Sequence, residues 1–283
     1  MPVSPECADC LLSRIRHTCI LAGRPGDAEA IVSTCAARLA VLREREVPQP
    51  VVASDLHRLA AGLLSVRDPY TKVKEESNAV VRDACRVVRP RLVTFRDHVI
   101  ASIIGNTFDH GVMGHRIADD FLAFFEEEFA RGLAIDDCDA IAPLLGRVVY
   151  ITDNCGEIVL DRLLIGYIAG RGARVTVAVR DGPVLNDATI EDARALGIDR
   201  LVDLLTTTGG GSEMGVPLDR VPPELADAID RADLVIAKGM ANYESLSEYT
   251  GLPPVAYLLT AKCRPIAGRL GVRVGEKVAL LCG

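Results

Sequence analysis

The sequence predicts an α/β protein with a helical N-terminal region at about residues 1–145 and a doubly wound, mostly parallel sheet at residues 146–283. Two patterns support this. Before residue 146 the apolar residues recur at helical spacing, and no stretch alternates as a strand does. From residue 147 onward, short apolar runs alternate with helical segments, which is typical of βαβ units. We therefore expect a Rossmann-like, three-layer α/β/α core with the helical region packed on it as one compact body.

The helical region contains six expected helices, and several of their ends can be identified. Asp27 can cap the second helix and Ser54 the third, because short polar side chains accept hydrogen bonds from the first free amides. Pro48 and Pro90 stop the second and the fourth helix, since proline cannot continue a helix. The six helices span about 5–22, 28–46, 54–65, 70–88, 95–105 and 116–131.

The α/β region reads as strands that alternate with helices. The expected strands lie at 147–152, 173–179, 201–205, 233–237, 254–259 and 277–281. The expected helices lie between them, at about 157–169, 188–196, 222–232, 243–249 and 263–270. In such a sheet the carboxyl ends of the strands share one edge, and open α/β sheets bind their ligands there.

Composition disfavours several classes of protein. The 283 residues carry 32 Lys and Arg against 39 Asp and Glu, and a net charge of −7 disfavours sequence-independent binding of nucleic acid. No apolar run is long enough to span a membrane, and the N-terminus lacks the features of a signal peptide, so we expect a cytoplasmic protein without a membrane partner. The 9 cysteines, an odd number, argue against a disulfide framework. Composition leaves the oligomeric state open.

Polar residues follow four consecutive expected strands. They are the run Asp153-Asn154-Cys155-Gly156-Glu157, the pair Asn186-Asp187, the glycines 209–211, and the run that begins Lys238-Gly239. Asp153, Asn154 and Asp187 offer the oxygen ligands that Mg²⁺ or Mn²⁺ prefers. Lys238 offers a positive charge for a phosphate, and Gly239 with the following helix N-terminus offers amide donors. The pattern predicts a metal and phosphate site at one edge of the sheet.

Each of these segments also has a plain structural interpretation. Asn154 with Glu157 matches a helix-capping pair, and Asn186-Asp187 matches an ordinary cap. Lys238-Gly239 matches a turn that ends a strand. A functional site is favoured because all of these segments fall on one expected edge. The sequence contains neither GxGxxG after the first strand nor a P-loop pattern, which disfavours a dinucleotide site.

Several motifs follow one another in a fixed order over nearly the whole chain. In the α/β region they are TDNCGEIVLD at 152–161, PVLNDAT at 183–189, IAKGMANYESL at 236–246 and AKCRPIA at 261–267. In the helical region they are Pro5-x-Cys7-x-x-Cys10, Asp68-Pro69-Tyr70 with Lys74 and Asn78, and Gly105-Asn106-x-x-Asp109. Together these motifs resemble those of the metal-dependent damage-control phosphatases, formerly domain-of-unknown-function family eighty-nine. The N-terminal cysteine pair is similar to that of a branch of mostly archaeal and bacterial stand-alone proteins.

The resemblance implies metal-dependent hydrolysis of small phosphate monoesters, such as damaged or overflow sugar phosphates and cofactor-precursor phosphates. It implies Mn²⁺, Co²⁺, Ni²⁺ or Mg²⁺ as the metal. The implied metal ligands are Asp153, Asn154 and Asp187, and the implied phosphate ligand is Lys238. The substrate-binding set that we expect is Asn106, Lys238, Gly239 and Asn242. Asn106 and Asp109 would reach the same cleft from the helical side.

Three questions stay open at this point. Glu157 or Asp109 could orient a water that the metal activates, or Asp153 could attack the phosphorus and form an aspartyl phosphate; we favour the water. Cys7 and Cys10 could be packed thiols, a redox pair, or a second metal site completed by Cys263. Alternative functions are a carboxyl methyltransferase that uses S-adenosylmethionine and a non-catalytic metal-binding protein. A methyltransferase of this kind would have a Gly-rich loop after the first strand, where this chain has DNCGE.

Overall fold

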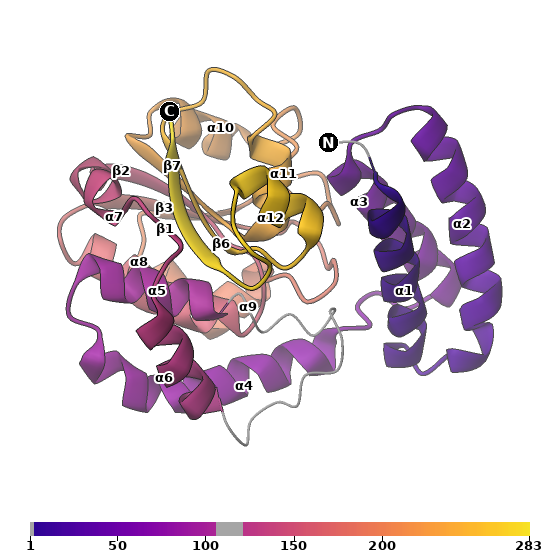
Figure 1. Cartoon of the computed structure of the whole chain (residues 1–283), viewed down its shortest axis with the longest axis horizontal. Coiled ribbons are helices and arrows are strands. Elements are labelled where there is room, and N and C mark those ends of the chain that lie inside the picture. Colours follow the sequence, from indigo (N-terminus) through magenta and orange to yellow (C-terminus); the bar gives the residue numbers. More distant parts are fainter. Residues whose placement is uncertain (1–2, 106–120) are drawn as a thin grey trace.

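The structure, a computed structural model, describes residues 3–105 and 121–283, and it contains the expected helical N-terminal region followed by a seven-stranded sheet (Figure 1). The N-terminal helices are α1 (Pro5–Leu21), α2 (Ala28–Glu44), α3 (Gln49–Leu64), α4 (Thr71–Val88), α5 (Phe95–Gly105), α6 (Phe121–Arg131) and α7 (Cys138–Ile141). The strands are β1 (Ile135–Asp136), β2 (Arg147–Ile151), β3 (Arg174–Val179), β4 (Leu204–Thr207), β5 (Leu234–Lys238), β6 (Val255–Thr260) and β7 (Lys277–Cys282). The helices between the later strands are α8 (Glu157–Ala169), α9 (Ile190–Ala195), α10 (Pro223–Asp230), α11 (Gly239–Leu246) and α12 (Arg264–Leu270).

The strand order places a topological switch point at the centre of the sheet. The order is β1-β7-β6-β5-β2-β3-β4, and every neighbouring pair is parallel except β6 with β7. From β2 the chain moves outward through β3 and β4, and then returns to place β5 on the other side of β2. Helices that follow β2 and β5 therefore leave on opposite faces, and the crevice between these two strand ends is where such sheets bind ligands.

Successive side chains along each strand point to opposite faces of the sheet and so belong alternately to two apolar layers. Leu234 and Ile236 of β5 belong to the layer formed with α5 and α8, while Val235 and Ala237 belong to the layer formed with α10, α11 and α12. The side chains of β2 and β6 are divided between the same two layers, so both faces of the sheet are covered by apolar side chains. This arrangement confirms the expected mostly parallel α/β architecture with flanking helices.

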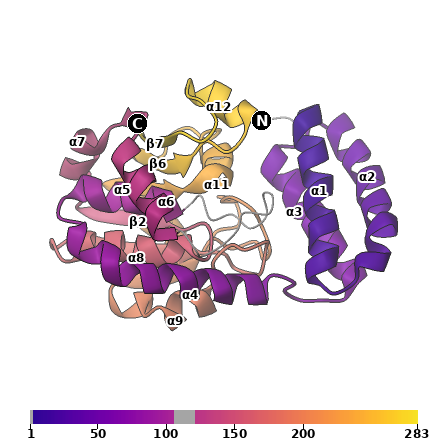
Figure 2. The same ribbon diagram turned by 60° about the horizontal axis from the view of Figure 1, so that its bottom comes forward.

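The helical region contributes to two different places. Helices α1, α2 and α3 form a bundle beside the sheet core, seen in Figures 1 and 2. Their apolar core also contains Val184, Leu185 and Met214, which come from loops at the carboxyl edge of the sheet. Helices α5 and α8 instead cover one face of the sheet, and α4 and α6 pack on these two helices. The division into two units near residue 145 stays a prediction.

Some expected boundaries were wrong, and each has a local cause. Helix α3 begins at Gln49 rather than at Ser54, because Pro50 lies in its first turn, where a missing amide costs nothing. The Ser54 hydroxyl instead donates to the Pro50 carbonyl at 2.7 Å and accepts from the Met214 amide at 2.8 Å. Helix α11 begins directly at Gly239. The two-residue strand β1 was missed because it is too short to show a period. Over the described ranges, no helix is long and apolar enough to cross a membrane.

Candidate active site

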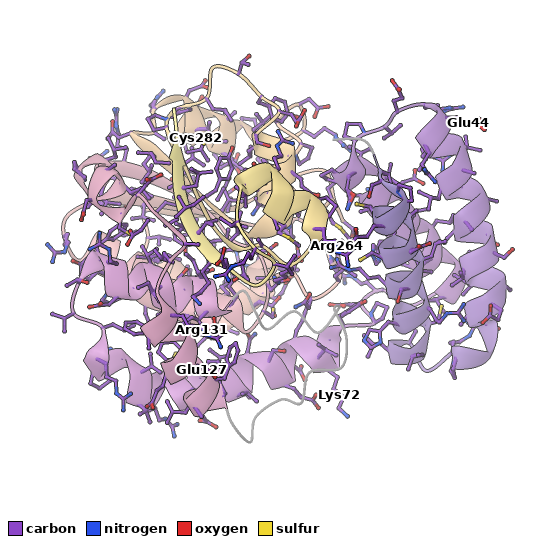
Figure 3. All side chains as sticks on the ribbon, in the orientation of Figure 1. Glu44, Lys72, Glu127, Arg131, Arg264 and Cys282 are labelled. Carbon is purple, nitrogen blue, oxygen red and sulfur yellow. The ribbon has the colours of Figure 1, made fainter. Side chains whose placement is uncertain are left out.

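A cavity of about 470 Å³ opens between the α1–α3 bundle and the carboxyl edge of the sheet. The bundle contributes Cys7, Cys10, Leu11, Arg14 and Pro50 to its wall. The sheet side contributes Asp153, Asn154 and Asp187, and also Lys262, Cys263 and Arg264. Figure 3 labels Arg264 at the end of α12 that faces α1. The cavity thus lies at the switch point and carries several of the residues that the sequence placed there.

The structure brings the three expected metal ligands together. Asp153 and Asn154 follow β2 after one residue, Thr152, and Asp187 follows β3, the neighbouring strand. Asn154 and Asp187 face each other across an isolated antiparallel bridge. The Ala188 amide donates to the Asp153 carbonyl at 2.8 Å, so the two loops are joined by backbone as well. The spacing of these ligands therefore rests on main-chain geometry rather than on flexible side chains.

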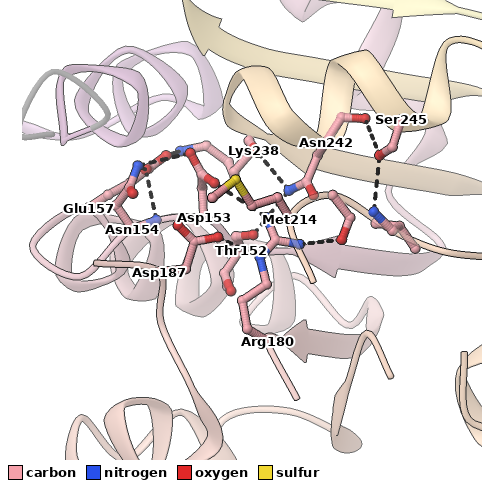
Figure 4. Close-up of polar contacts among 12 residues, drawn as sticks. Thr152, Asp153, Asn154, Glu157, Arg180, Asp187, Met214, Lys238, Asn242 and Ser245 are labelled. Atoms are coloured by element: carbon pink, nitrogen blue, oxygen red, sulfur yellow. Dashed lines mark hydrogen bonds and ion pairs between the residues drawn. The ribbon is translucent and has the colours of Figure 1, made fainter. Parts of the chain in front are cut away.

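Arg180 holds the two carboxylates in place (Figure 4). Its guanidinium, 1% exposed, donates to Asp187 Oδ2 at 2.6 Å and to Asp153 Oδ1 at 3.4 Å. It also donates to the Gly215 carbonyl at 2.6 Å. A planar guanidinium can make these contacts at once, which explains why the position requires arginine. Arg180 was not predicted from the sequence, although it is the first residue after an expected strand.

The electrostatics of the site suit a divalent cation. Burial raises the pKa of the Asp153 carboxyl well above its usual range, and the charges of Asp187 and Glu157 add to this, while Arg180 and Lys262 act in the opposite direction. The Asn154 Nδ2 donates to Asp153 Oδ2 at 2.8 Å, which leaves the amide oxygen available to a cation. Crowded carboxylates with an amide oxygen form the ligand type of Mg²⁺ and Mn²⁺. The residues present therefore fit the metal that the sequence implies.

Gly239 closes the site from the β5 side. Its φ is +77°, and a Cβ placed on it would lie 1.9 Å from Asp153 Oδ2 and 2.4 Å from Asp153 Cγ. Only glycine permits both this backbone conformation and this approach. The expected site residue Gly239 is thus in contact with a proposed metal ligand, and the residues after it, Met240 and Ala241, line the cavity.

Lys238 lies elsewhere than expected. Its side chain is 0% exposed and is not part of the cavity wall; its Nζ is bonded to Glu157, Asp161 and the Ser102 carbonyl. Burial opposes its charge, but Asp161 and Glu157 outweigh burial and raise the pKa of Lys238. Its ammonium is therefore charged but turned into the protein, between α5 and α8. This placement favours another residue as the cation that meets a phosphate.

Lys262, by contrast, lies at the cavity. It comes shortly after β6, is half-buried and lines the cavity, and its positive charge lowers the pKa of Asp153. Lys262 was not predicted as a phosphate ligand, because it lies in AKCRPIA, after the fifth expected strand, whereas the predicted site residues follow the first four. The same pattern, a polar residue at the carboxyl end of a strand, would have identified it.

The other expected site residues divide into three groups. Asn242 is 0% exposed, and its Nδ2 donates to the carbonyls of Thr152 at 3.0 Å and Lys238 at 2.7 Å, so it ties the ends of β2 and β5 together. Glu157 is also fully buried and lies outside the cavity wall. Asn106 and Asp109 lie outside the described residues.

Cys7 and Cys10 line the same cavity as Cys263, which places the N-terminal cysteine pair next to the candidate site. Within the residues that the structure describes, no group of three or more His, Cys, Asp or Glu side chains is arranged to hold a metal. The second metal expected at Cys7 and Cys10 therefore gains no support from their geometry. All nine cysteines are free, in agreement with the expectation that there is no disulfide framework.

Fold and site together define a class: an α/β protein with carboxylate and amide side chains gathered at the switch point of its sheet. Residues 3–278 match the family described as "Damage-control phosphatase ARMT1-like domain". The chain belongs to this family, whose members depend on a metal, and it is a phosphatase. The resemblance seen in the sequence motifs is thereby confirmed.

Two relatives and one solved structure cover almost the entire chain. The chain is 42% identical over 289 residues to a damage-control phosphatase of Archaeoglobus fulgidus, with 99% of each covered. It is 33% identical over 288 residues to damage-control phosphatase PH1575 of Pyrococcus horikoshii, with 100% of this chain and 98% of the relative covered. The crystal structure of PH1575, described as a duf89 family protein, has a TM-score of 0.86 at 30% identity and 99% coverage of both chains. A phosphatase acts on phosphorylated compounds, so phosphorylated metabolites are the substrates that this membership implies.

Proposed function

We propose that this phosphatase hydrolyses small phosphate monoesters with a divalent cation held by Asp153, Asn154 and Asp187. The observation that carries the proposal is that these oxygen ligands share one cavity with Lys262. A cation bound there would polarise a phosphoryl oxygen and lower the pKa of a water. Mn²⁺, Co²⁺, Ni²⁺ and Mg²⁺ are the candidates because each accepts oxygen ligands in proteins.

The phosphate would lie between the metal ligands, Lys262 and the first turn of α11. Met240 and Ala241 of that turn line the cavity. Backbone amides at the start of a helix lack intrahelical partners and favour anions. The ammonium of Lys262 neutralises a non-bridging phosphoryl oxygen from the side of β6. The family resemblance further supports Asn106 as a substrate ligand and Asp109 as the residue that orients the water.

Asp153 is a poor nucleophile in this arrangement, which supports attack by water. Its Oδ2 accepts from Asn154 and its Oδ1 accepts from Arg180. These hydrogen bonds, together with a bound cation, would draw electron density from both oxygens and so weaken them as nucleophiles toward phosphorus. The proposed role of Asp153 is therefore to bind the cation and not to form an aspartyl phosphate.

The cavity suits a metabolite rather than a macromolecule. Its volume, about 470 Å³, lies in the usual range for small-ligand sites. Arg14 and Arg264 on its wall favour substrates with further anionic or hydroxyl groups. Sugar phosphates and cofactor-precursor phosphates, whether damaged or in excess, have this chemistry. No observation favours the methyltransferase alternative, because metal ligands rather than a Gly-rich loop follow β2.

An aryl phosphate assay with each of the four metals tests the proposal. Lys262→Met should lower kcat/KM for para-nitrophenyl phosphate by roughly 100-fold, the scale for one preorganised charge-stabilising group, and should leave the cation bound. Lys72→Met is the matched control, because the Lys72 side chain is 86% exposed on α4 and lies outside the cavity wall. Absence of hydrolysis with all four metals, or equal activity of the two variants, would contradict the proposed function.

A further inference from the structure

Three ionisable side chains lie buried behind the candidate metal ligands and outside the cavity wall. Lys238, Glu157 and Asp161 are all 0% exposed, and they come from β5 and α8. Figure 4 shows Lys238 and Glu157 beside Asn154 and Asp153. Burying three charges is costly unless they serve one another, so their contacts indicate what the cluster does.

The ammonium of Lys238 has no proton left for a substrate. It donates to Glu157 Oε1 at 2.6 Å, to Asp161 Oδ1 at 2.8 Å and to the Ser102 carbonyl at 3.1 Å. An ammonium has three donors, and these acceptors account for all of them. Lys238 therefore acts on other protein groups.

Glu157 connects this cluster to the metal site. One carboxylate oxygen, Oε1, accepts from Lys238, while the other, Oε2, accepts from both the backbone amide and the side-chain Nδ2 of Asn154 at 3.3 Å. The same Nδ2 donates to Asp153 Oδ2 at 2.8 Å. Two carboxylates thus hold the amide nitrogen of Asn154, and its oxygen is forced to the opposite side.

Asp161 anchors the far side of the cluster. Its Oδ1 accepts from Lys238, from the Ser102 hydroxyl at 2.7 Å and from the Tyr150 hydroxyl at 2.8 Å. These partners come from β5, α5 and β2, so three other elements hold Asp161, and Asp161 with the Ser102 carbonyl gives the Lys238 ammonium fixed acceptors. A rigid Lys238 in turn leaves Glu157 one orientation.

We propose that Glu157 and Lys238 are positioning residues for metal binding. Lys238 fixes the Glu157 carboxylate, and Glu157 fixes the Asn154 amide so that its oxygen faces the cation. This inference rests on the proposed function, because it requires a cation at Asp153, Asn154 and Asp187. Groups that orient metal ligands through hydrogen bonds typically contribute 10–100-fold in metal affinity.

The competing role for Glu157 is orientation of the attacking water. Its full burial and its absence from the cavity wall oppose this role, since such a group must reach the water by a hydrogen bond. The two roles predict different results for Glu157→Gln, which keeps the volume of the side chain. If the glutamine oxygen stays on Lys238, its NH₂ meets the donors of Asn154 and turns that amide away from the cation.

Calorimetric titration of the full-length protein with Mn²⁺, after removal of metal by chelation, tests the inference without relying on turnover. Glu157→Gln should bind Mn²⁺ about 10–100-fold more weakly than the wild type. The double variant Lys238→Met/Asp161→Asn, which removes one charge of each sign, should show a similar loss. Lys72→Met, at an exposed position outside the cavity wall, is the control and should bind Mn²⁺ as the wild type does. Thermal melting establishes that each variant is folded, and the isosteric Glu157→Gln carries the test if the double variant is not.

A second readout separates positioning from catalysis. Saturating Mn²⁺ should restore most of kcat for para-nitrophenyl phosphate in Glu157→Gln, because its three metal ligands are intact, but should not restore Lys262→Met. Unaltered Mn²⁺ affinity in a folded Glu157→Gln, with or without loss of turnover, would overturn the inference while leaving the proposed function in place. A wild-type protein that binds none of the four metals would instead overturn the proposed function on which the inference rests.

Discussion

Replacing Gly239 by alanine perturbs the candidate site by a single methyl group. The Cβ would lie 1.9 Å from Asp153 Oδ2, and contacts of a Cβ below 3.0 Å essentially do not occur in proteins. Asp153 would have to withdraw by about 1 Å, yet its two oxygens are held by Asn154 and Arg180. The alternative, a shift of the start of α11, would move the helix amides that border the cavity.

The size of the effect follows from this displacement. A misplacement of about 1 Å in a catalytic site can lower activity roughly 100-fold. The φ of +77° adds strain of about 1–2 kcal/mol for any residue with a Cβ. We therefore expect Gly239→Ala to lose about 100-fold in kcat/KM and about 1–2 kcal/mol in the free energy of unfolding. The assays are hydrolysis of para-nitrophenyl phosphate with Mn²⁺ and urea unfolding followed by circular dichroism.

Two matched glycine variants separate the site from a general clash. Gly166→Ala, within α8, meets no atom within 4 Å and should leave kcat/KM unchanged. Gly146→Ala places its Cβ 2.5 Å from Asp233 Oδ2, just before β2 at the opposite edge of the sheet. It should cost stability but not activity at saturating Mn²⁺. If Gly239→Ala retains the kcat/KM of Gly166→Ala, the close packing of Gly239 on Asp153 has no functional role and the reasoning is refuted.

Three further outcomes are expected. Chelation should abolish turnover and Mn²⁺, Co²⁺, Ni²⁺ or Mg²⁺ should restore it, whereas full activity after exhaustive chelation would falsify metal dependence. Asp153→Asn should abolish turnover and raise the free energy of unfolding in the absence of metal, because it relieves repulsion from Asp187 and Glu157; an active variant that melts far earlier would mean that Asp153 is structural. Burial, together with the charge of Arg14, lowers the pKa of His57 from 6.5 to about 3. As the pH falls below 6.5, His57 therefore becomes protonated in the unfolded chain but stays neutral in the folded protein, and the free energy of unfolding decreases. Between about pH 7 and 5 this should cost about 2 kcal/mol in urea unfolding, and a pH dependence unchanged in His57→Gln would contradict the assignment.

The proximity of the three proposed metal ligands could be predicted from the sequence because it depends only on where the strands end. Asp153 and Asn154 follow β2 after one residue, and Asp187 follows β3 after a short loop. Parallel neighbours in a sheet bring their carboxyl ends to one edge, whatever the packing of the rest. Identifying the strands was therefore sufficient to bring these three residues together, and errors of a few residues at helix boundaries did no harm.

The direction of Lys238 could not be predicted from its place at a strand end alone. In β5, Lys238 shares a face with Leu234 and Ile236, since side chains alternate along a strand. That face is covered by α5 and α8, so the ammonium points at Glu157 rather than into the cavity. The alternation of side chains along the strand can be read from the sequence. The sequence does not show which helices cover each face of the sheet.

The sequence by itself determined the order of strands and helices and the gathering of Asp153, Asn154 and Asp187 at the carboxyl edge of the sheet, because local periodicity and chain direction specify them. Only the tertiary structure decided which charged groups face the cavity and which support it from behind. Lys238 and Lys262 both lie at or near the end of a strand, yet one is enclosed by Glu157 and Asp161 and the other borders the cavity. Their difference arises from contacts between segments more than 70 residues apart in the chain. Packing, and not spacing in the sequence, decides which acceptors an ammonium meets.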